Sequence, residues 1–171
     1  MPAKTDLTAP GAVLFTCNFN RVRSPMAEAL FKLMLGTGVF VDSCGLMHGR
    51  GDDDEPADAV QADPLVRVVM AEIGYDLFHH RAKTFDELED SSFDLVISLT
   101  PESQDRATEL ARGRAADIEY WPTADPTRAE GSREARLAAY REVRNSLARR
   151  IAERFGGAEP SPIDLAPRDA L

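Results

Sequence analysis

The eight residues Cys17-Asn18-Phe19-Asn20-Arg21-Val22-Arg23-Ser24 join a short apolar run, residues 12–16, to a segment with helical periodicity that begins at Pro25. The apolar run predicts a buried strand, so the Cys17 thiol falls at a strand-to-helix turn. Backbone N–H groups and the positive end of the helix dipole converge at such a turn, where they bind oxyanions and stabilise a thiolate. Arg23 adds a guanidinium that binds two oxyanion oxygens at once. The sequence predicts an anion-binding loop with a nucleophile at its base.

The start of the following helix carries its own signals. Ser24 is predicted to be the N-cap and Pro25 the first helical residue, because Pro has no N–H to leave unpaired there. Gly36 is expected to end the helix. Within the loop, Asn20 is a residue type that tolerates the left-handed backbone conformation of tight turns.

The remainder of the chain alternates between strand and helix patterns. Further strands are predicted at residues 39–45, 93–99 and 118–121, and further helices at residues 64–73, 101–111 and 132–155. Such alternation predicts a single α/β domain with a four-stranded parallel sheet, helices on both faces and a ligand site beyond the carboxyl ends of the strands. We expect this domain to span residues 1–155. Residues 156–171 contain three prolines and no periodicity, and are expected to form a flexible tail.

Composition narrows the classes of partner. A formal net charge of −9 argues against nucleic acid or an anionic membrane as the partner and favours a small anionic ligand at the arginines of the loop. The two cysteines, Cys17 and Cys44, fit neither a zinc motif nor a disulfide framework, so both are expected to be reduced thiols. No signal peptide or membrane span is visible in the sequence, which leads us to expect a cytoplasmic protein. Its oligomeric state is open.

The loop and its surroundings resemble the low-molecular-weight protein tyrosine phosphatases, a superfamily that also contains thioredoxin-coupled arsenate reductases. The family signature is Cys, five residues, Arg and Ser or Thr, often followed by Pro-Met-Ala-Glu. Cys17, Arg23, Ser24 and residues 25–28 match it in register. Four later segments extend the resemblance to about residues 12–155: Asp42-Ser43-Cys44-Gly45, Glu55-Pro56-Ala57-Asp58, His80-Arg81-Ala82 and Asp125-Pro126.

The resemblance implies a chemistry and a set of roles. Cys17 would form a cysteinyl phosphate, Arg23 would stabilise the transferring group, and Asp125 would act as general acid and base, with no metal or other cofactor. The substrate would be a phosphorylated protein or a small phosphomonoester. Asn18, Phe19, Asn20, Arg21, Val22, Arg23 and Ser24 would bind its phosphate. A supporting network would comprise Asn20, Ser24, Ser43 and His80, in which Ser24 could donate to the Cys17 thiolate as well as cap the helix.

The chain also departs from the family pattern. Phe19 replaces a glycine, Arg21 replaces an aliphatic residue, and Val22 replaces the second loop cysteine that many members carry. Cys44 replaces an alanine, and two interpretations stay open: a small buried apolar residue, or a disulfide partner of Cys17. Thr127 and Arg128 stand where phosphotyrosine-specific members carry aromatic residues, which leaves the substrate open.

Three functions are therefore considered. The first is a cysteine-dependent phosphatase, acting by resemblance on phosphotyrosine. The second is arsenate reduction, for which these reductases need two further cysteines; Thr100 stands at the position of one and no cysteine follows Cys44, so only an external thiol could complete that reaction. The third is a catalytically weak binding module whose slot is blocked by Phe19 and Arg21.

Overall fold

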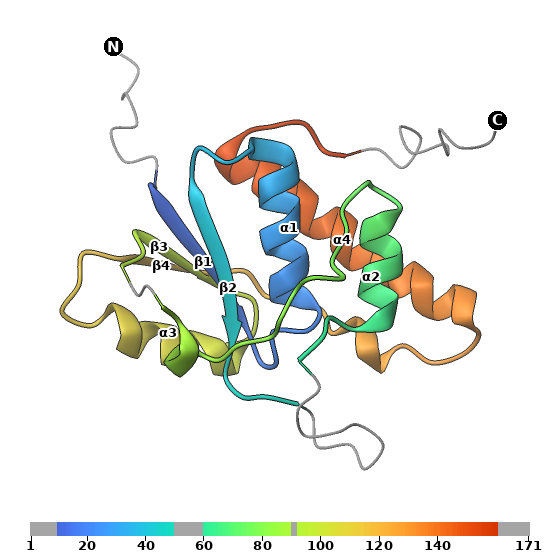
Figure 1. The fold of residues 1–171 in the computed structure, drawn as a ribbon, viewed down its shortest axis with the longest axis horizontal. Coiled ribbons are helices and arrows are strands. Elements are labelled where there is room, and N and C mark those ends of the chain that lie inside the picture. The colour runs from blue at the N-terminus through green and yellow to red at the C-terminus, as the bar shows by residue number, and fades with distance from the viewer. Residues whose placement is uncertain (1–9, 50–59, 90–91, 161–171) are drawn as a thin grey trace.

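The computed structural model describes residues 10–49, 60–89 and 92–160, and it has the predicted single-domain α/β architecture (Figure 1). Four parallel strands form one sheet in the order β2-β1-β3-β4. The strands are β1 Ala12–Cys17, β2 Phe40–Gly45, β3 Leu95–Ser98 and β4 Asp117–Tyr120. The sequence match at residues 55–58 and the last part of the predicted tail, residues 161–171, lie outside the described residues.

The register of the sheet positions the loop that follows β1. Cys17 pairs with Gly45 of β2, and Thr16 pairs with Ser98 of β3, so the carboxyl ends of three adjacent strands lie at one edge. The order of the strands puts β1 between β2 and β3. The loop that leaves Cys17 is therefore flanked on both sides by the segments that leave its neighbours.

Helices cover both faces of the sheet, as predicted. α1 (Arg23–Leu35), α2 (Pro64–Ala71) and α4 (Arg133–Phe155) lie on one face, and α3 (Pro101–Ala111) covers the other (Figure 1). Because side chains alternate along a strand, β1 contributes to both cores. Phe15 belongs to the larger core beneath α1 and α4, and Leu14 belongs to the smaller core beside α3. None of the helices in the described ranges is long and apolar enough to cross a membrane.

Element boundaries differ from the sequence predictions by one or two residues. α2 ends at Ala71, although Ile73 beyond it is still buried, since the chain turns there while its apolar side chain stays in the core. Similarly, β3 lacks the flanking Phe93 and Leu99, which are buried but lie outside the strand. Apolar periodicity in a sequence indicates which residues are buried. Burial extends beyond the last backbone hydrogen bond of a helix or strand, so the predictions for α2 and β3 are longer than the observed elements.

Side-chain caps distinguish α1 from the other helices. Asp63 caps α2, Thr100 caps α3 and Ser132 caps α4, each by accepting a hydrogen bond from a backbone N–H of the first turn. In α1 the helix begins at Arg23, its N-cap is Val22, and no side chain accepts such a bond. The predicted cap at Ser24 is therefore wrong, and the N-terminus of α1 is left for another acceptor.

Candidate active site

The backbone of the Cys17 loop is tightly turned and closely packed. Asn20 has φ 56°, in the left-handed region that the sequence analysis expected for it. A side chain at Gly45 would meet the backbone of the loop, because an added Cβ would lie 2.8 Å from the amide nitrogen of Asn20 and 2.9 Å from the carbonyl oxygen of Asn18. The end of β2 thus packs so closely against the loop that only glycine fits at position 45 without a shift of the backbone.

A buried chain of hydrogen bonds leads from the Cys17 sulfur into the protein. Cys17 Sγ lies 2.9 Å from Ser24 Oγ. Asn20 Nδ2 donates to Ser24 Oγ and to Ser43 Oγ, both at 2.8 Å. Ser43 Oγ in turn donates to Glu28 Oε1 at 2.7 Å. Ser24 accepts from Asn20, so its own proton can go to the Cys17 sulfur or to the carbonyl oxygen of Cys44, which lies farther away at 3.4 Å; directed at the sulfur, it would stabilise a thiolate.

Of the two roles expected for Ser24, the structure contradicts the helix cap and provides the contact with Cys17. Cap preference is a local property of the sequence, but here the hydroxyl is fully buried and is held between Cys17 and Asn20. Glu28 is a member of this network that the sequence analysis did not name. The signal for it was present, because Glu28 is the last residue of the matched Pro-Met-Ala-Glu segment.

The side chain and the carbonyl oxygen of Asn20 are held by groups from several parts of the chain. Its Oδ1 accepts from the backbone N–H of Lys83 at 3.0 Å, and its carbonyl oxygen accepts from His80 Nε2 at 2.8 Å. Burial lowers the pKa of His80 below its ordinary value. The structure thus brings together the four residues expected in the supporting network: Asn20, Ser24, Ser43 and His80.

Arg23 and Asp125 lie on segments that are joined to each other. Arg23 Nη1 donates to the carbonyl oxygen of Thr123 at 3.0 Å, and Asp125 follows two residues later. Asp125 precedes the short helix η2 (Pro126–Arg128), and its Oδ1 accepts from the N–H and the hydroxyl of Thr127 at 3.0 and 2.6 Å. The carboxylate is therefore oriented by Thr127, which stands where aromatic residues were expected from the resemblance.

The atypical loop residues Phe19, Arg21 and Val22 are all half-buried. Arg21 Nε donates to the carbonyl oxygen of Gln61 at 3.0 Å, and its own carbonyl accepts from the N–H of Asp63 at 3.0 Å. These bonds connect the loop to the start of α2. Phe19 is half-buried, and Val22 is half-buried against the larger core. The replacement of the second loop cysteine by valine therefore extends apolar packing toward the loop.

Cys44 lies on the opposite face of the sheet from Cys17. It pairs in register with Thr16, and partners in a parallel ladder point the same way, whereas consecutive residues of a strand point in opposite directions. Cys17 accordingly belongs to the core under α1, and Cys44 to the core beside α3. Burial raises the pKa of the Cys44 thiol. Of the two open interpretations, the geometry supports the small buried residue and opposes the disulfide.

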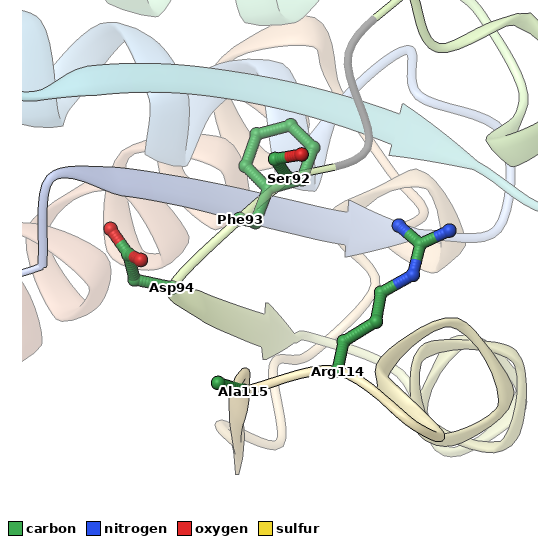
Figure 2. Close-up of a pocket in the computed structure, with 5 residues that line it drawn as sticks. All are labelled: Ser92, Phe93, Asp94, Arg114 and Ala115. Atoms are coloured by element: carbon green, nitrogen blue, oxygen red, sulfur yellow. The ribbon is translucent and has the colours of Figure 1, made fainter.

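The aromatic residues at the end of β4 divide between core and surface. Trp121 is buried and its ring contacts Phe15 edge-on in the larger core, whereas Tyr120 is partly exposed. A separate hollow of about 390 Å³ lies at the amino ends of β3 and β4 (Figure 2). It is lined by Ser92, Phe93, Asp94, Arg114 and Ala115. Because the Cys17 loop follows the carboxyl end of β1, this hollow is distinct from the candidate active site.

The sequence is similar to a known protein family and to proteins of two named activities. The family model described as low molecular weight phosphotyrosine protein phosphatase matches residues 12–153. An arsenate reductase of Halalkalibacterium halodurans is 32% identical over 142 residues, which cover 81% of this chain and 91% of that protein. A low molecular weight protein-tyrosine-phosphatase of Streptomyces coelicolor is 37% identical over 90 residues, which cover 51% of each chain.

Solved structures give the same pair of activities. An arsenate reductase in the phosphate binding state superposes with a TM-score of 0.63 and 26% identity, over 83% of this chain and 94% of that chain. A protein tyrosine phosphatase superposes with a TM-score of 0.59 and 26% identity, over 82% and 92%. The chain therefore belongs to the low molecular weight phosphotyrosine protein phosphatase family.

Proposed function

We propose that this protein is a cysteine-dependent phosphomonoester hydrolase that acts on phosphotyrosine in proteins. The observation that carries the proposal is the contact of 2.9 Å between Cys17 Sγ and Ser24 Oγ, at the base of a loop that opens onto an uncapped helix N-terminus. A thiolate needs a donor, and a phosphate dianion needs convergent N–H groups. The loop offers both at one place.

The first step would be attack of the Cys17 thiolate on phosphorus. A bond forms between sulfur and phosphorus, the bond from phosphorus to the leaving oxygen breaks, and Asp125 gives its proton to that oxygen. Arg23 and the loop N–H groups stabilise the equatorial oxygens, where charge stabilisation does most of the catalytic work. Residues 18–24 thereby hold the phosphate.

The second step would release phosphate. Asp125, now a carboxylate, takes a proton from water, and the water oxygen attacks phosphorus. The bond between sulfur and phosphorus breaks, and the electron pair returns to Cys17 as thiolate. Ser24 then stabilises the leaving sulfur by the same contact that stabilised the attacking one. Each residue ends in the state in which it began.

Arsenate reduction is a second candidate because named arsenate reductases are among the relatives. In this chain it would need an external thiol, since Cys44 faces away from Cys17 and no cysteine follows it. Cys17 would bond to arsenic with loss of water, and the external thiol would then attack the Cys17 sulfur. The bond between sulfur and arsenic breaks with its electron pair on arsenic, which leaves as arsenite, and a second external thiol releases Cys17 from the mixed disulfide. An oxyanion loop with a nucleophilic cysteine suits the binding step of either reaction.

A side-by-side assay separates these functions. Purified wild type, Cys17→Ser and Asp125→Ala are compared with para-nitrophenyl phosphate, with a phosphotyrosine peptide and with the matched phosphoserine peptide. In parallel, arsenite formation is measured with arsenate and glutathione. Thermal unfolding of each variant controls for folding.

Hydrolysis of the aryl phosphate and the phosphotyrosine peptide, lost in Cys17→Ser and strongly reduced in Asp125→Ala, supports the proposal. Equal activity of wild type and Cys17→Ser refutes the assignment of the nucleophile. Thiol-dependent arsenite formation without phosphatase activity selects the reductase. A folded wild type with no turnover in either assay selects the binding module, in which Phe19 and Arg21 restrict the slot.

A further inference from the structure

Asn18, the first residue after β1, is connected to the segments that follow both neighbouring strands. Its carbonyl oxygen accepts from the N–H groups of Leu46 and Met47, which follow β2, at 2.8 and 3.1 Å. Its side-chain Oδ1 accepts from Thr100 Oγ1, two residues after β3, at 2.7 Å. Asn18 is thus hydrogen-bonded to the segments that follow β2 and β3, the two strands on either side of β1.

The Thr100 hydroxyl is hydrogen-bonded both to the loop and to the first turn of α3. Because Asn18 Oδ1 can only accept, Thr100 Oγ1 is the donor in that contact at 2.7 Å, and Ser103 Oγ is a second acceptor at 2.8 Å. The oxygen of Thr100 in turn accepts from the N–H of Ser103 at 3.1 Å, which is the N-cap bond of α3. Thr100 is 1% exposed. Burial of Thr100 and Ser103 shields these hydroxyls from solvent, which strengthens their hydrogen bonds.

A second hydroxyl secures the same corner. Ser103 is fully buried, and its Oγ lies 2.8 Å from Thr100 Oγ1 and 3.3 Å from the carbonyl oxygen of Thr16 in β1. The N-terminus of α3 is therefore attached to β1 directly and to the loop through Thr100. A displacement of Thr100 would be transmitted to Asn18, the residue next to the nucleophile.

We infer that Thr100 is a positioning residue for the phosphate loop, acting through Asn18. It does not contact the phosphate; it fixes the residue after Cys17, so that the N–H groups of the loop are aimed before the anion arrives. Preorganised donors contribute most where charge develops in the transition state, because they need not reorient during the reaction. The inference rests on the proposed phosphate chemistry of Cys17. It requires a hydroxyl group at position 100.

The test separates the loop contact from the helix cap, because Thr100 supplies both. Thr100→Val removes both, Thr100→Ser keeps both, and Asn18→Leu removes the loop contact while it leaves the cap of α3 intact. Ser132→Ala is the matched control, since Ser132 caps α4 with the same kind of bond at an exposed site. Measured are kcat and KM with para-nitrophenyl phosphate, the Kd for inorganic phosphate by calorimetry, and the melting temperature.

A net hydrogen bond corresponds to about a three- to tenfold change in an equilibrium or rate constant. We expect Thr100→Val and Asn18→Leu each to lower kcat about tenfold, with a smaller rise in KM and about a threefold rise in the phosphate Kd. Thr100→Ser, which keeps the hydroxyl, should have kcat, KM and phosphate Kd values near those of wild type. In kcat and in the phosphate Kd, the double variant Thr100→Val/Asn18→Leu should be no worse than Thr100→Val, because the contact between these two residues is already lost in that single variant. Ser132→Ala should lower the melting temperature alone.

Additive losses in the double variant, or a phosphate Kd unchanged in Asn18→Leu, would overturn the inference. So would loss of melting temperature without loss of kcat in Thr100→Val, which would make Thr100 a helix cap only. If Thr100→Val does not fold, Asn18→Leu and Thr100→Ser still decide the matter. A wild type that binds phosphate but hydrolyses no phosphomonoester would refute the proposed function, and the phosphate Kd values would still test Thr100.

Discussion

Arg23 Nη1 donates to the carbonyl oxygen of Thr123 at 3.0 Å, which joins the first turn of α1 to the segment that carries Asp125. The two residues are a hundred positions apart in the chain. Arg23 has five N–H donors in a rigid plane, so one can hold Thr123 while others face a phosphate. In the proposed mechanism, the same side chain would bind the anion and set the position of Asp125, the proposed general acid, relative to it.

The first prediction concerns Arg23→Lys. A lysine keeps the charge but has no planar array of donors, so it cannot hold Thr123 and two phosphate oxygens together. We expect kcat for aryl phosphate hydrolysis to fall by about 10²-fold or more, with the melting temperature nearly unchanged. Arg149→Lys, on an exposed position of α4, is the matched control. Activity of Arg23→Lys within twofold of wild type would remove Arg23 from the catalytic group.

Local patterns predicted the fold well because they report burial and backbone conformation. The apolar run before Cys17 and the helical period after Pro25 were enough to predict the strand-loop-helix unit. The left-handed backbone of Asn20 was expected from its residue type alone. Each of these features depends on neighbours in the sequence, and the structure agrees with each.

Features that depend on register were not accessible in this way. The face of the sheet on which Cys44 lies follows from its pairing with Thr16, and no property of residues 42–45 contains that pairing. The same limit explains Ser24, whose cap propensity is overridden by its partners Cys17 and Asn20. The contact of Thr100 with Asn18 joins residues 82 positions apart, and it becomes visible only when β1 and β3 are placed side by side.

The second prediction concerns oxidation. Because Cys44 is buried on the opposite face of the sheet from Cys17, mild treatment with hydrogen peroxide should not produce an intramolecular disulfide. Mass spectrometry of the intact protein should show the gain of oxygen on Cys17 and no loss of two hydrogens. Iodoacetamide should label Cys17 and spare Cys44 in the folded state. A disulfide found in wild type and absent in Cys44→Ala would contradict the assignment of faces.

The third prediction concerns pH and His80. Burial lowers the pKa of His80 in the folded protein, whereas the unfolded chain keeps a value near 6.5. The neutral form is therefore favoured by folding, and its contribution to stability is present above about pH 6.5 and is lost as the pH falls through the folded pKa. Glu28, Lys83 and Asp42 are the charged neighbours that modulate the shift.

Urea denaturation of wild type, His80→Gln and His79→Gln between about pH 7.5 and pH 5 measures this contribution. Wild type and His79→Gln should lose more free energy of unfolding on acidification than His80→Gln, which has no imidazole to charge at this site. His79 is exposed and adjacent in sequence, so it controls for the loss of a histidine as such. Identical pH dependence in all three proteins would show that His80 titrates as it does in the unfolded chain.

The fourth prediction concerns Gly45, whose missing side chain makes room for the loop. In Gly45→Ala the new Cβ would lie 2.8 Å from Asn20 N, 2.8 Å from the carbonyl carbon of Phe19 and 2.9 Å from the carbonyl oxygen of Asn18. All three are backbone atoms, so no side-chain rotation relieves the overlap and the loop itself must move. We expect a loss of about 1–3 kcal/mol in the free energy of unfolding.

Loss of activity should exceed what this destabilisation alone would cause. The displaced residues bear the proposed donors for the phosphate and the hydrogen-bond partners of Cys17, so kcat for the aryl phosphate should fall about tenfold or more at a temperature where the variant is fully folded. Gly38→Ala is the matched control, because an added Cβ there meets no atom within 4 Å. It should leave both stability and kcat near the wild-type values. Full activity in a folded Gly45→Ala would mean that the loop tolerates displacement, and that the close packing of β2 against it is not needed to aim its donors.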